Sequence, residues 1–242
     1  MQDERAVEDA VILCGGLGTR LRAVLEGRPK SLAPVRGRPF LEWLVLALAR
    51  QGVRRVVLAS GYLDEQLRQH FGRERFGVEI LHSTESEPLG TGGALQLAAS
   101  LVRPPTLAVL NGDTFCRFDL ARMANFHQAH DAAATIWLAP AEDRERFGSV
   151  EVDAEGRVVA FHEKAERGEG CVNAGIYLIE RDVVRGIRGR SSLERDVFPG
   201  LVGKGLYAIT GSSGLVDIGT PDALAQAEYA LVEEFDELER FA

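Results

Sequence analysis

The sequence has few cysteines, and their spacing suits neither a metal site nor a set of bridges. Cys14, Cys116 and Cys171 lie far apart and form no CxxC pair. Three cysteines cannot all pair within one chain, so neither a disulfide framework nor a zinc site is indicated. A reducing cytoplasm is the simplest setting for such a chain, and we expect that location.

Long apolar runs and an excess of positive charge are also missing. No run approaches the roughly 18 uncharged apolar residues that span a bilayer, and the acidic start MQDERAVEDA is unlike a signal peptide. The net charge of −8 repels nucleic acid and anionic lipid over the surface as a whole. We therefore expect neither a nucleic-acid nor a membrane partner. An anionic ligand would need a local cluster of Lys and Arg.

Short β-rich runs alternate with segments of helical period, which predicts an α/β fold. The first of these are a strand over 10–14, a helix over 39–51 and a strand over 54–60. Such alternation predicts a mostly parallel sheet flanked by helices. Shorter strands from about 140 to 215 predict a small antiparallel extension. With no linker or repeat, we expect one domain over 1–242, with 1–8 as a loose tail.

Capping signals stand near the end of the chain. Ser191 and Glu194 have the spacing of a capping box, and Thr220 followed by Pro221 is typical of a helix start. We predict Glu194 to be a capping residue. The last helix is expected to bury Leu224, Ala227, Leu231 and Phe235. The apolar helices leave room for a homodimer interface.

The stretch LCGGLGTRLRAVLEGRPKSLAPV, residues 13–35, is too rich in glycine for a plain turn. It follows the first strand, and in a parallel sheet ligands bind at the carboxyl ends of strands. Gly15, Gly16 and Gly18 would let backbone amides approach an anion, with Arg20 and Lys30 beside them. The Walker loop and the dinucleotide fingerprint are both excluded, because neither pattern continues after Gly18.

The remaining pattern resembles the signature of the sugar-nucleotide pyrophosphorylases, which join a nucleoside triphosphate to a sugar 1-phosphate. Further motifs follow in that family's order: EPLGTGGAL (87–95), NGD (111–113), RFGSVEVD (146–153), FHEK (161–164), NAGIYLI (173–179) and VDIGTPD (216–222). The resemblance implies a GT-A-like, Rossmann-like α/β fold. It also implies that the antiparallel extension, about 140–215, forms the sugar side of the site.

By this resemblance, catalysis falls to Arg20, Lys30 and Asp113, and Asp113 with Asp217 would hold Mg²⁺ against the phosphates. Nucleotide-binding positions would be Leu13, Cys14, Gly15, Gly16, Gly18, Thr19, Glu87, Gly90 and Thr91. Positions facing the sugar phosphate would be Gly112, Gly148, Glu163, Lys164, Asn173 and Gly175. Each polar residue among these also has a plainer interpretation as a solvated loop, turn or capping residue.

Guanine presents two donor groups on one edge, so a carboxylate such as Glu87 or Glu85 suits it as an acceptor pair. The motifs together are most similar to the short bacterial D-glycero-D-manno-heptose 1-phosphate guanylyltransferases, which serve capsule and lipopolysaccharide synthesis. GTP and a heptose 1-phosphate are therefore the favoured substrates. A hexose 1-phosphate with another base, and a non-catalytic nucleotide-sugar regulator, remain as alternatives. The failed dinucleotide fingerprint disfavours a dehydrogenase.

Overall fold

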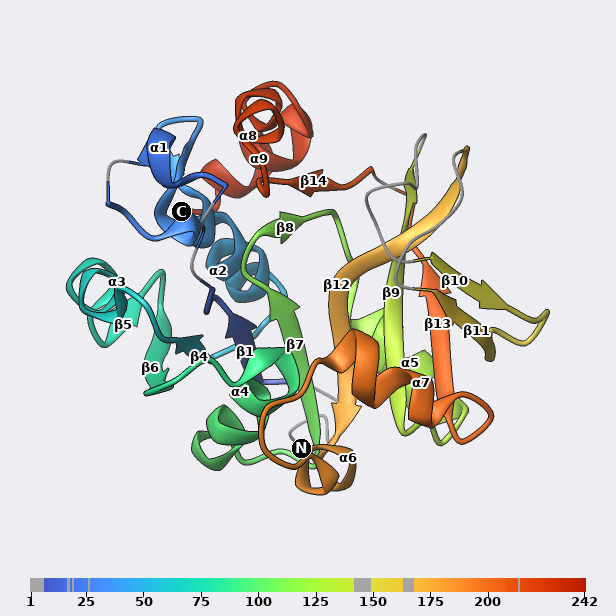
Figure 1. The fold of residues 1–242 in the computed structure, drawn as a ribbon. Coiled ribbons are helices and arrows are strands. Elements are labelled where there is room, and N and C mark those ends of the chain that lie inside the picture. Colours follow the sequence, from blue (N-terminus) through green and yellow to red (C-terminus); the bar gives the residue numbers. More distant parts are fainter. Residues whose placement is uncertain are drawn as a thin grey trace.

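The computed structural model describes residues 7–16, 18, 20–25, 27–141, 149–162, 168–212 and 214–242. A ten-stranded sheet runs through this part of the chain (Figure 1). Its strands are β1 (Asp9–Leu13), β4 (Arg55–Ser60), β5 (Glu74–Arg75), β6 (Val78–Thr84), β7 (Thr106–Asn111), β9 (Ala134–Ala141), β10 (Ser149–Val152), β11 (Val158–His162), β12 (Gly170–Glu180) and β13 (Leu206–Thr210). The predicted α/β class is confirmed.

The sheet has a parallel half and a mostly antiparallel half. Its main path runs β11-β10-β12-β7-β1-β4-β6-β5, and β9 joins β12 to β13. Neighbours among β7, β1, β4 and β6 are parallel, whereas β12 is antiparallel to both β7 and β9. The predicted antiparallel extension therefore continues the same sheet. How far a sugar-binding lobe extends over 140–215 stays a prediction.

Helices cover both faces of the sheet (Figure 1). They are α1 (Arg22–Leu25), α2 (Phe40–Arg50), α3 (Asp64–Phe71), α4 (Gly90–Ala98), α5 (Leu120–Ala129), α6 (Arg181–Gly186), α7 (Phe198–Leu201), α8 (Pro221–Ala227) and α9 (Val232–Glu239). Short 3-10 turns cover Lys30–Leu32 and Ala99–Leu101, and a π-helical turn covers Leu193–Val197. Two small ribbons pair β2 (Pro34–Val35) with β3 (Arg38–Pro39), and β8 (Thr114–Phe115) with β14 (Val216–Asp217).

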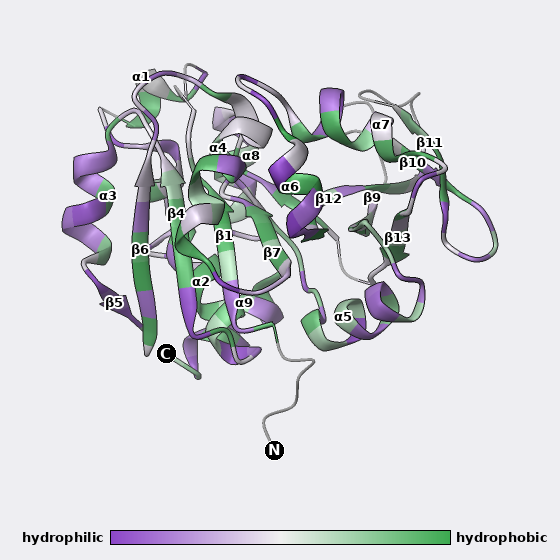
Figure 2. Ribbon diagram, turned by 90° about the horizontal axis from the view of Figure 1, so that it is seen from below, coloured by the Kyte–Doolittle hydropathy of each residue, from purple (hydrophilic) through white to green (hydrophobic). Residues whose placement is uncertain are grey.

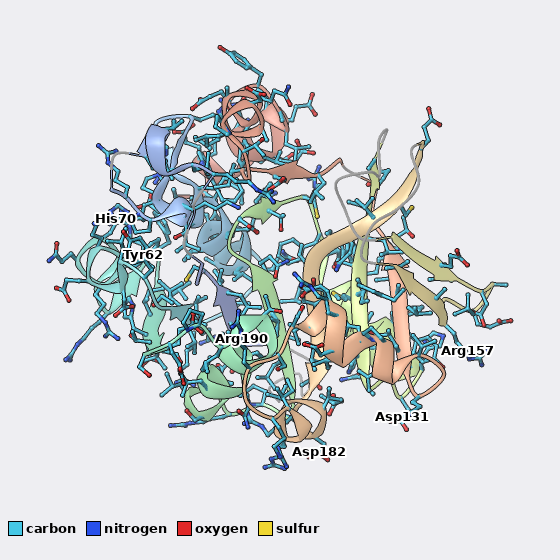
Figure 3. All side chains as sticks on the ribbon, in the orientation of Figure 1. Tyr62, His70, Asp131, Arg157, Asp182 and Arg190 are labelled. Carbon is cyan, nitrogen blue, oxygen red and sulfur yellow. The ribbon has the colours of Figure 1, made fainter. Side chains whose placement is uncertain are left out.

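The two faces of the sheet bury separate apolar clusters, which is why the central strands are apolar throughout. Ala10 and Ile12 of β1 join one cluster, while Val11 and Leu13, pointing the other way, join the second. Figure 2 shows the hydrophobic colour on β1, β4 and β7, whereas α3 is mostly hydrophilic. Figure 3 places the polar Asp131 and Arg157 at the outer edge of the β9–β13 half.

The chain ends in two helices where the sequence predicts one. Thr220 caps α8 by accepting from the backbone N–H of Ala223, as predicted. The helical run breaks after α8, and α9 begins after Leu231, whose φ is 48°. Leu224, Ala227 and Phe235 are buried as predicted, but Leu231 at the break is only partly buried. Apolar residues recur at helical spacing on both sides of the break, so the sequence pattern does not indicate that the helix is interrupted there.

The predicted tail is partly attached to the body of the protein. Residues 1–6 lie outside the described residues. Val7 packs against the core, and the carbonyl of Glu8 accepts from the backbone N–H groups of Arg54 and Arg55. Within the described ranges, no helix has both the length and the apolar character needed to cross a membrane.

Candidate active site

A cavity of about 380 Å³ lies at the carboxyl ends of β1 and β7. Its lining consists of Leu13, Cys14, Gly15, Gly16, Gly18, Arg20, Leu21, Lys30, Ser31, Gly112, Asp113, Asp217 and Gly219. All three predicted catalytic residues and both predicted metal ligands therefore lie around one space. The cavity stands where a parallel sheet is expected to bind ligands.

Backbone hydrogen bonds hold the start of the glycine loop close to β4 and to the end of β7. Cys14 donates its N–H to Ala59 O, and Gly112 donates to Leu13 O, both at 2.9 Å. A Cβ at Gly112 would lie 3.0 Å from Leu13 O, so a larger residue would push the NGD segment away from the loop. Gly16 and Gly18 have φ of 135° and 53°, a region that favours glycine. The loop is thus held at both strands while its amides stay near the cavity.

The surroundings of the Cys14 thiol disfavour the thiolate form that a nucleophile needs. Burial raises its pKa to about 12, and the sulfur contacts the Ala59 carbonyl at 3.3 Å. Reactive cysteines need a lowered pKa, because the thiolate is the attacking form. Cys14 therefore contributes only a small side chain beside the glycine loop.

Arg20 and Lys30 bring positive charge to the cavity. Arg20 is exposed at its edge. The Lys30 ammonium donates to Asp113 Oδ2 at 2.6 Å, and the two side chains are 21% and 42% exposed. An ion pair this open to water contributes less than about 1 kcal/mol. Lys30 can therefore exchange Asp113 for a phosphate at little cost.

Asp217 ends β14 and Asp113 directly precedes β8, so the β8–β14 ribbon brings both carboxylates to the cavity. Asp217 lies opposite Thr114, and Ile218 donates its N–H to Asp113 O at 3.0 Å. Asp217 Oδ1 accepts from Gly219 N–H at 2.7 Å. No group of three or more potential ligands occurs among the described residues. Two carboxylates in one cavity still fit a Mg²⁺ ion, which keeps several waters and takes its other ligands from phosphates.

Glu85, rather than Glu87, lies against the glycine loop. Its Oε2 accepts from Leu89 N–H at 3.0 Å, which fixes the carboxylate. A Cβ on Gly15 would come within 3.1 Å of Oε1, and one on Gly61 within 2.8 Å of Cγ. Glu87 is exposed. The glycines at 15 and 61 thus make room for a carboxylate beside the loop.

Comparison with known proteins decides the family. The family profile described as nucleotidyl transferase matches residues 9–234. The chain belongs to this nucleotidyl transferase family. It is 35% identical over 226 residues to D-glycero-alpha-D-manno-heptose 1-phosphate guanylyltransferase of Aneurinibacillus thermoaerophilus, covering 92% of this chain and 98% of that protein. The family predicted from the motifs is confirmed.

Two further similar proteins differ in the share of their own length that this chain covers. Mannose-1-phosphate guanylyltransferase of Mycobacterium tuberculosis is 39% identical over 231 residues, which are 93% of this chain but 64% of that protein. The crystal structure of HddC from Yersinia pseudotuberculosis superposes with a TM-score of 0.80 at 30% identity. That match covers 97% of this chain and all of HddC, and HddC is also known in complex with GMP-PN.

A chain of hydrogen bonds that the sequence does not reveal joins the two halves of this nucleotidyl transferase. Thr91 Oγ1 donates to Glu194 Oε2 at 2.9 Å, and Tyr177 OH donates to Glu194 Oε1 at 3.2 Å. Asn173 Nδ2 in turn donates to Tyr177 OH at 2.9 Å. Burial, together with the nearby charge of Glu194, raises the pKa of Tyr177 well above its ordinary value. The hydroxyl therefore stays protonated.

The predicted capping box at Ser191 and Glu194 is wrong. Ser192 is the N-cap, accepting from Arg195 N–H, and the turn that follows is π-helical. Glu194 points instead to Thr91 and Tyr177. Spacing alone cannot distinguish these outcomes, because Thr91 is about a hundred residues away in the sequence. The turn over Leu193–Val197 is π-helical, and such turns are frequent at functional sites, but the spacing of residues in the sequence does not predict one.

Gly175 lets β12 pass close to the NGD segment. Its φ is 73°, and a Cβ there would lie 2.7 Å from Asn111 Nδ2 and 2.8 Å from Thr114 Oγ1. Asn111 Oδ1 is buried and accepts no hydrogen bond from any described residue. A substrate hydroxyl could fill that role, so Asn111 is a candidate that the sequence interpretation missed. Thr19, Gly148, Glu163 and Lys164 lie outside the described residues.

Proposed function

We propose that this protein transfers a guanylyl group from GTP to a sugar 1-phosphate, with D-glycero-D-manno-heptose 1-phosphate as the favoured acceptor. The observation that carries the proposal is the convergence of the glycine loop, two cations and two carboxylates on one cavity. The similarity to two guanylyltransferases supports the choice of guanine. The match along nearly the whole heptose enzyme favours the heptose.

The reaction needs charge and position rather than a base. An oxygen of the sugar phosphate attacks the α-phosphorus of GTP, forming one P–O bond while the bond to pyrophosphate breaks. A phosphate monoester has a second pKa near ~6, so the nucleophile is already ionised at neutral pH. Two anions ~4 Å apart repel by about 4 kcal/mol at an effective dielectric near 20. Catalysis therefore consists of bringing the anions together and neutralising them.

Each cation has a distinct task in this proposal. Arg20, exposed at the rim, pairs with the β- and γ-phosphates and stabilises the leaving pyrophosphate. Lys30 leaves Asp113 and binds phosphate at the reacting centre, which its open ion pair permits. Asp113 and Asp217 would hold Mg²⁺, which supplies further positive charge to the phosphates when bound.

In this proposal the base and the sugar bind on opposite sides of the glycine loop. We assign Glu85 to the guanine edge, because its carboxylate is fixed beside Gly15 while Glu87 is exposed. We assign Asn173 and Asn111 to the sugar side, where Gly112 and Gly175 let the NGD segment pack closely against Leu13 and β12. Gly90 and Thr91 begin α4 on the nucleotide side. Gly148, Glu163 and Lys164 keep their predicted sugar-phosphate roles as a proposal.

The test is pyrophosphate release with Mg²⁺, measured for each of ATP, CTP, GTP, UTP and dTTP against heptose, mannose, glucose and galactose 1-phosphates. Release with GTP and the heptose alone establishes the specific reaction. A preference for mannose or another base would keep the mechanism and replace the substrate. Silence across the whole grid from folded protein would favour a non-catalytic nucleotide-sugar regulator.

A further inference from the structure

Glu85, to which we assign the guanine edge, rests on the loop that joins β4 to α3. The Glu85 N–H donates to Ser60 O at 2.9 Å. A Cβ on Gly61 would come within 2.8 Å of Glu85 Cγ and 3.0 Å of its Oε1. Both the backbone and the side chain of Glu85 therefore pack on this loop, so whatever fixes the loop also fixes the carboxylate.

Four side chains fix the ends of this loop, and we call them the Asp64 cluster: Ser60, Asp64, Arg68 and Thr84. Asp64 begins α3, and its side chain is 12% exposed. Its Oδ1 accepts from Ser60 Oγ, and its Oδ2 accepts from Arg68 Nε and, at 2.8 Å, from Thr84 Oγ1. Arg68 Nη2 also donates to Thr84 Oγ1, at 2.6 Å. Burial alone would raise the pKa of Asp64, but these hydrogen bonds outweigh it and lower that pKa below its ordinary value.

The Asp64 cluster lies where two parallel strands end. Ser60 is the last residue of β4, Thr84 is the last residue of β6, and the two are partners in the sheet register. Gly61 and Glu85 follow them directly, beyond this last pair of the ladder. Because Asp64 bonds both Ser60 and Thr84, it holds the two strand ends together at the point from which Gly61 and Glu85 leave the sheet.

The charges of Asp64 and Glu85 also place them near one another. The pKa of Cys14 is raised mainly by burial, and the negative charges of both carboxylates add to the rise. Asp64 and Glu85 therefore lie near the same thiol, beside the glycine loop. Arg68 offsets the charge of Asp64, which would otherwise repel the Glu85 carboxylate.

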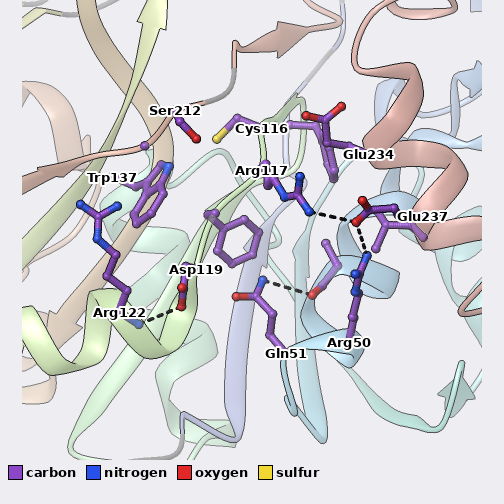
Figure 4. Close-up of a pocket in the computed structure, with 15 residues that line it drawn as sticks. Arg50, Gln51, Cys116, Arg117, Asp119, Arg122, Trp137, Ser212, Glu234 and Glu237 are labelled. Atoms are coloured by element: carbon purple, nitrogen blue, oxygen red, sulfur yellow. Dashed lines mark hydrogen bonds and ion pairs between the residues drawn. The ribbon is translucent and has the colours of Figure 1, made fainter.

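A second cavity, of about 460 Å³, has arginine–carboxylate pairs of a different kind at its rim (Figure 4). Arg50 and Arg117 both donate to Glu237 Oε2 there, each at 2.9 Å. These pairs join α2 and the segment after β8 to α9, and the cavity shares no lining residue with the active-site cavity. Glu237 thus offers a comparison, because its carboxylate pairs with arginines as Asp64 does but joins helices rather than strand ends.

We propose that Asp64 is a positioning residue for base recognition, which holds the end of β4 against the end of β6 so that the Glu85 carboxylate meets the guanine edge. The role rests on the proposed function, in which Glu85 accepts from guanine. Both Asp64 oxygens are engaged within the Asp64 cluster, so Asp64 acts through Glu85 and not by contact with the nucleotide. Hydrogen bonds weaken steeply when their partners are misaligned, so a small shift of Glu85 lowers the affinity for the base.

Kinetics with GTP and UTP test this role. Asp64→Ala should raise the KM for GTP by about tenfold and leave kcat within about twofold, because a contact to the base binds substrate and transition state alike. The KM for UTP and for the sugar 1-phosphate should stay within about twofold. Asp64→Asn keeps the side-chain shape, should raise the KM for GTP by a smaller factor, and replaces Asp64→Ala if that variant does not fold. Glu237→Ala, the matched control, should change none of these constants.

A double variant shows whether Asp64 acts through Glu85. Once Glu85→Gln has removed the carboxylate, adding Asp64→Ala should raise the KM for GTP by less than about a further twofold. For a protein that prefers GTP, effects that multiply in the double variant would overturn the positioning role. A KM for GTP that Asp64→Ala leaves unchanged would overturn it as well.

Hydrogen exchange at the Leu89 amide tests the positioning role without any nucleotide. This amide donates to Glu85 Oε2 at 3.0 Å, so its exchange reports on where the carboxylate lies. Asp64→Ala should speed exchange at Leu89 by about tenfold or more, while the amides of β1 keep their rates and Glu237→Ala changes neither. Unchanged exchange at Leu89 would overturn the proposal. Faster exchange in a protein that shows no preference for GTP would overturn the guanine assignment and leave the positioning of Glu85 by Asp64 in place.

Discussion

Removing the Tyr177 hydroxyl tests the connection between the proposed nucleotide side and the proposed sugar side of the site. Tyr177 is fully buried, and its hydroxyl accepts from Asn173 and donates to Glu194. Tyr177→Phe keeps the ring contact with Phe198, whose centroid is 4.9 Å away, so little cavity is created. What is lost is one neutral hydrogen bond and one bond to a charged acceptor.

The size of this loss follows from the two bonds. A hydrogen bond to a charged group contributes about 1.5–3 kcal/mol, and leaving buried partners unpaired adds to the penalty. We expect Tyr177→Phe to lower the free energy of unfolding by about 2–3 kcal/mol. For a chain of this length that corresponds to roughly 5–10 °C in Tm. Urea unfolding and a thermal scan would measure it.

Kinetics and a matched control separate this role from general destabilisation. Asn173 loses its anchor, so the KM for the sugar 1-phosphate should rise more than the KM for GTP. Tyr229→Phe removes a hydroxyl from a residue that is 84% exposed and should change stability by less than about 0.5 kcal/mol. A double-mutant cycle of Tyr177→Phe with Glu194→Gln should give a coupling of about 0.5–3 kcal/mol. Unfolding curves for Tyr177→Phe that match the unmodified protein would refute the reasoning.

Three further predictions concern catalysis, base choice and pH. Lys30→Ala and Asp113→Ala should each reduce turnover by about a hundredfold or more, in line with the loss of electrostatic stabilisation, while urea midpoints stay close to normal; near-normal turnover in either would remove its assigned role. Glu85→Gln should raise the KM for GTP by roughly tenfold or more relative to UTP, whereas Glu87→Gln should not, and equal effects of the two would contradict the choice of Glu85. Burial lowers the pKa of His127 below its ordinary 6.5. As the pH falls, the unfolded chain therefore protonates His127 at a higher pH than the folded protein does. The contribution of neutral His127 to stability is lost as the pH falls below about 6.5. Urea unfolding between pH 7.5 and 5.5 should show a smaller fall for His127→Gln than for the unmodified protein, and an unchanged fall would contradict it.

Much of the fold is predictable because the strands carry strong local signals. β1, β4 and β7 are short apolar runs buried on both faces, and Phe40, Leu44 and Leu48 of α2 are buried at helical spacing. The break between α8 and α9 is different. The apolar period runs on from Leu224 to Phe235, and only packing decides that the chain turns at Leu231.

The residues of the candidate site also fall into those that the sequence predicts and those that only the packing brings together. The glycine loop, Arg20, Lys30 and the NGD segment were predictable, since backbone freedom and charge are local properties of a sequence. Their arrival in one cavity with Asp217 follows from the pairing of β8 with β14, about a hundred residues apart.

The sequence by itself determined the α/β class, the family and most residues of the candidate nucleotide site, because those depend on periodicity and on contiguous motifs. Tertiary structure alone decided that Glu85 and not Glu87 lies beside the loop, and that Glu194 bonds Thr91 and Tyr177 instead of capping a helix. It alone also assembled the second cavity, whose walls come from five separate segments. Contacts between distant segments depend on how the sheet and its helices pack, and that information is not contained in any local pattern.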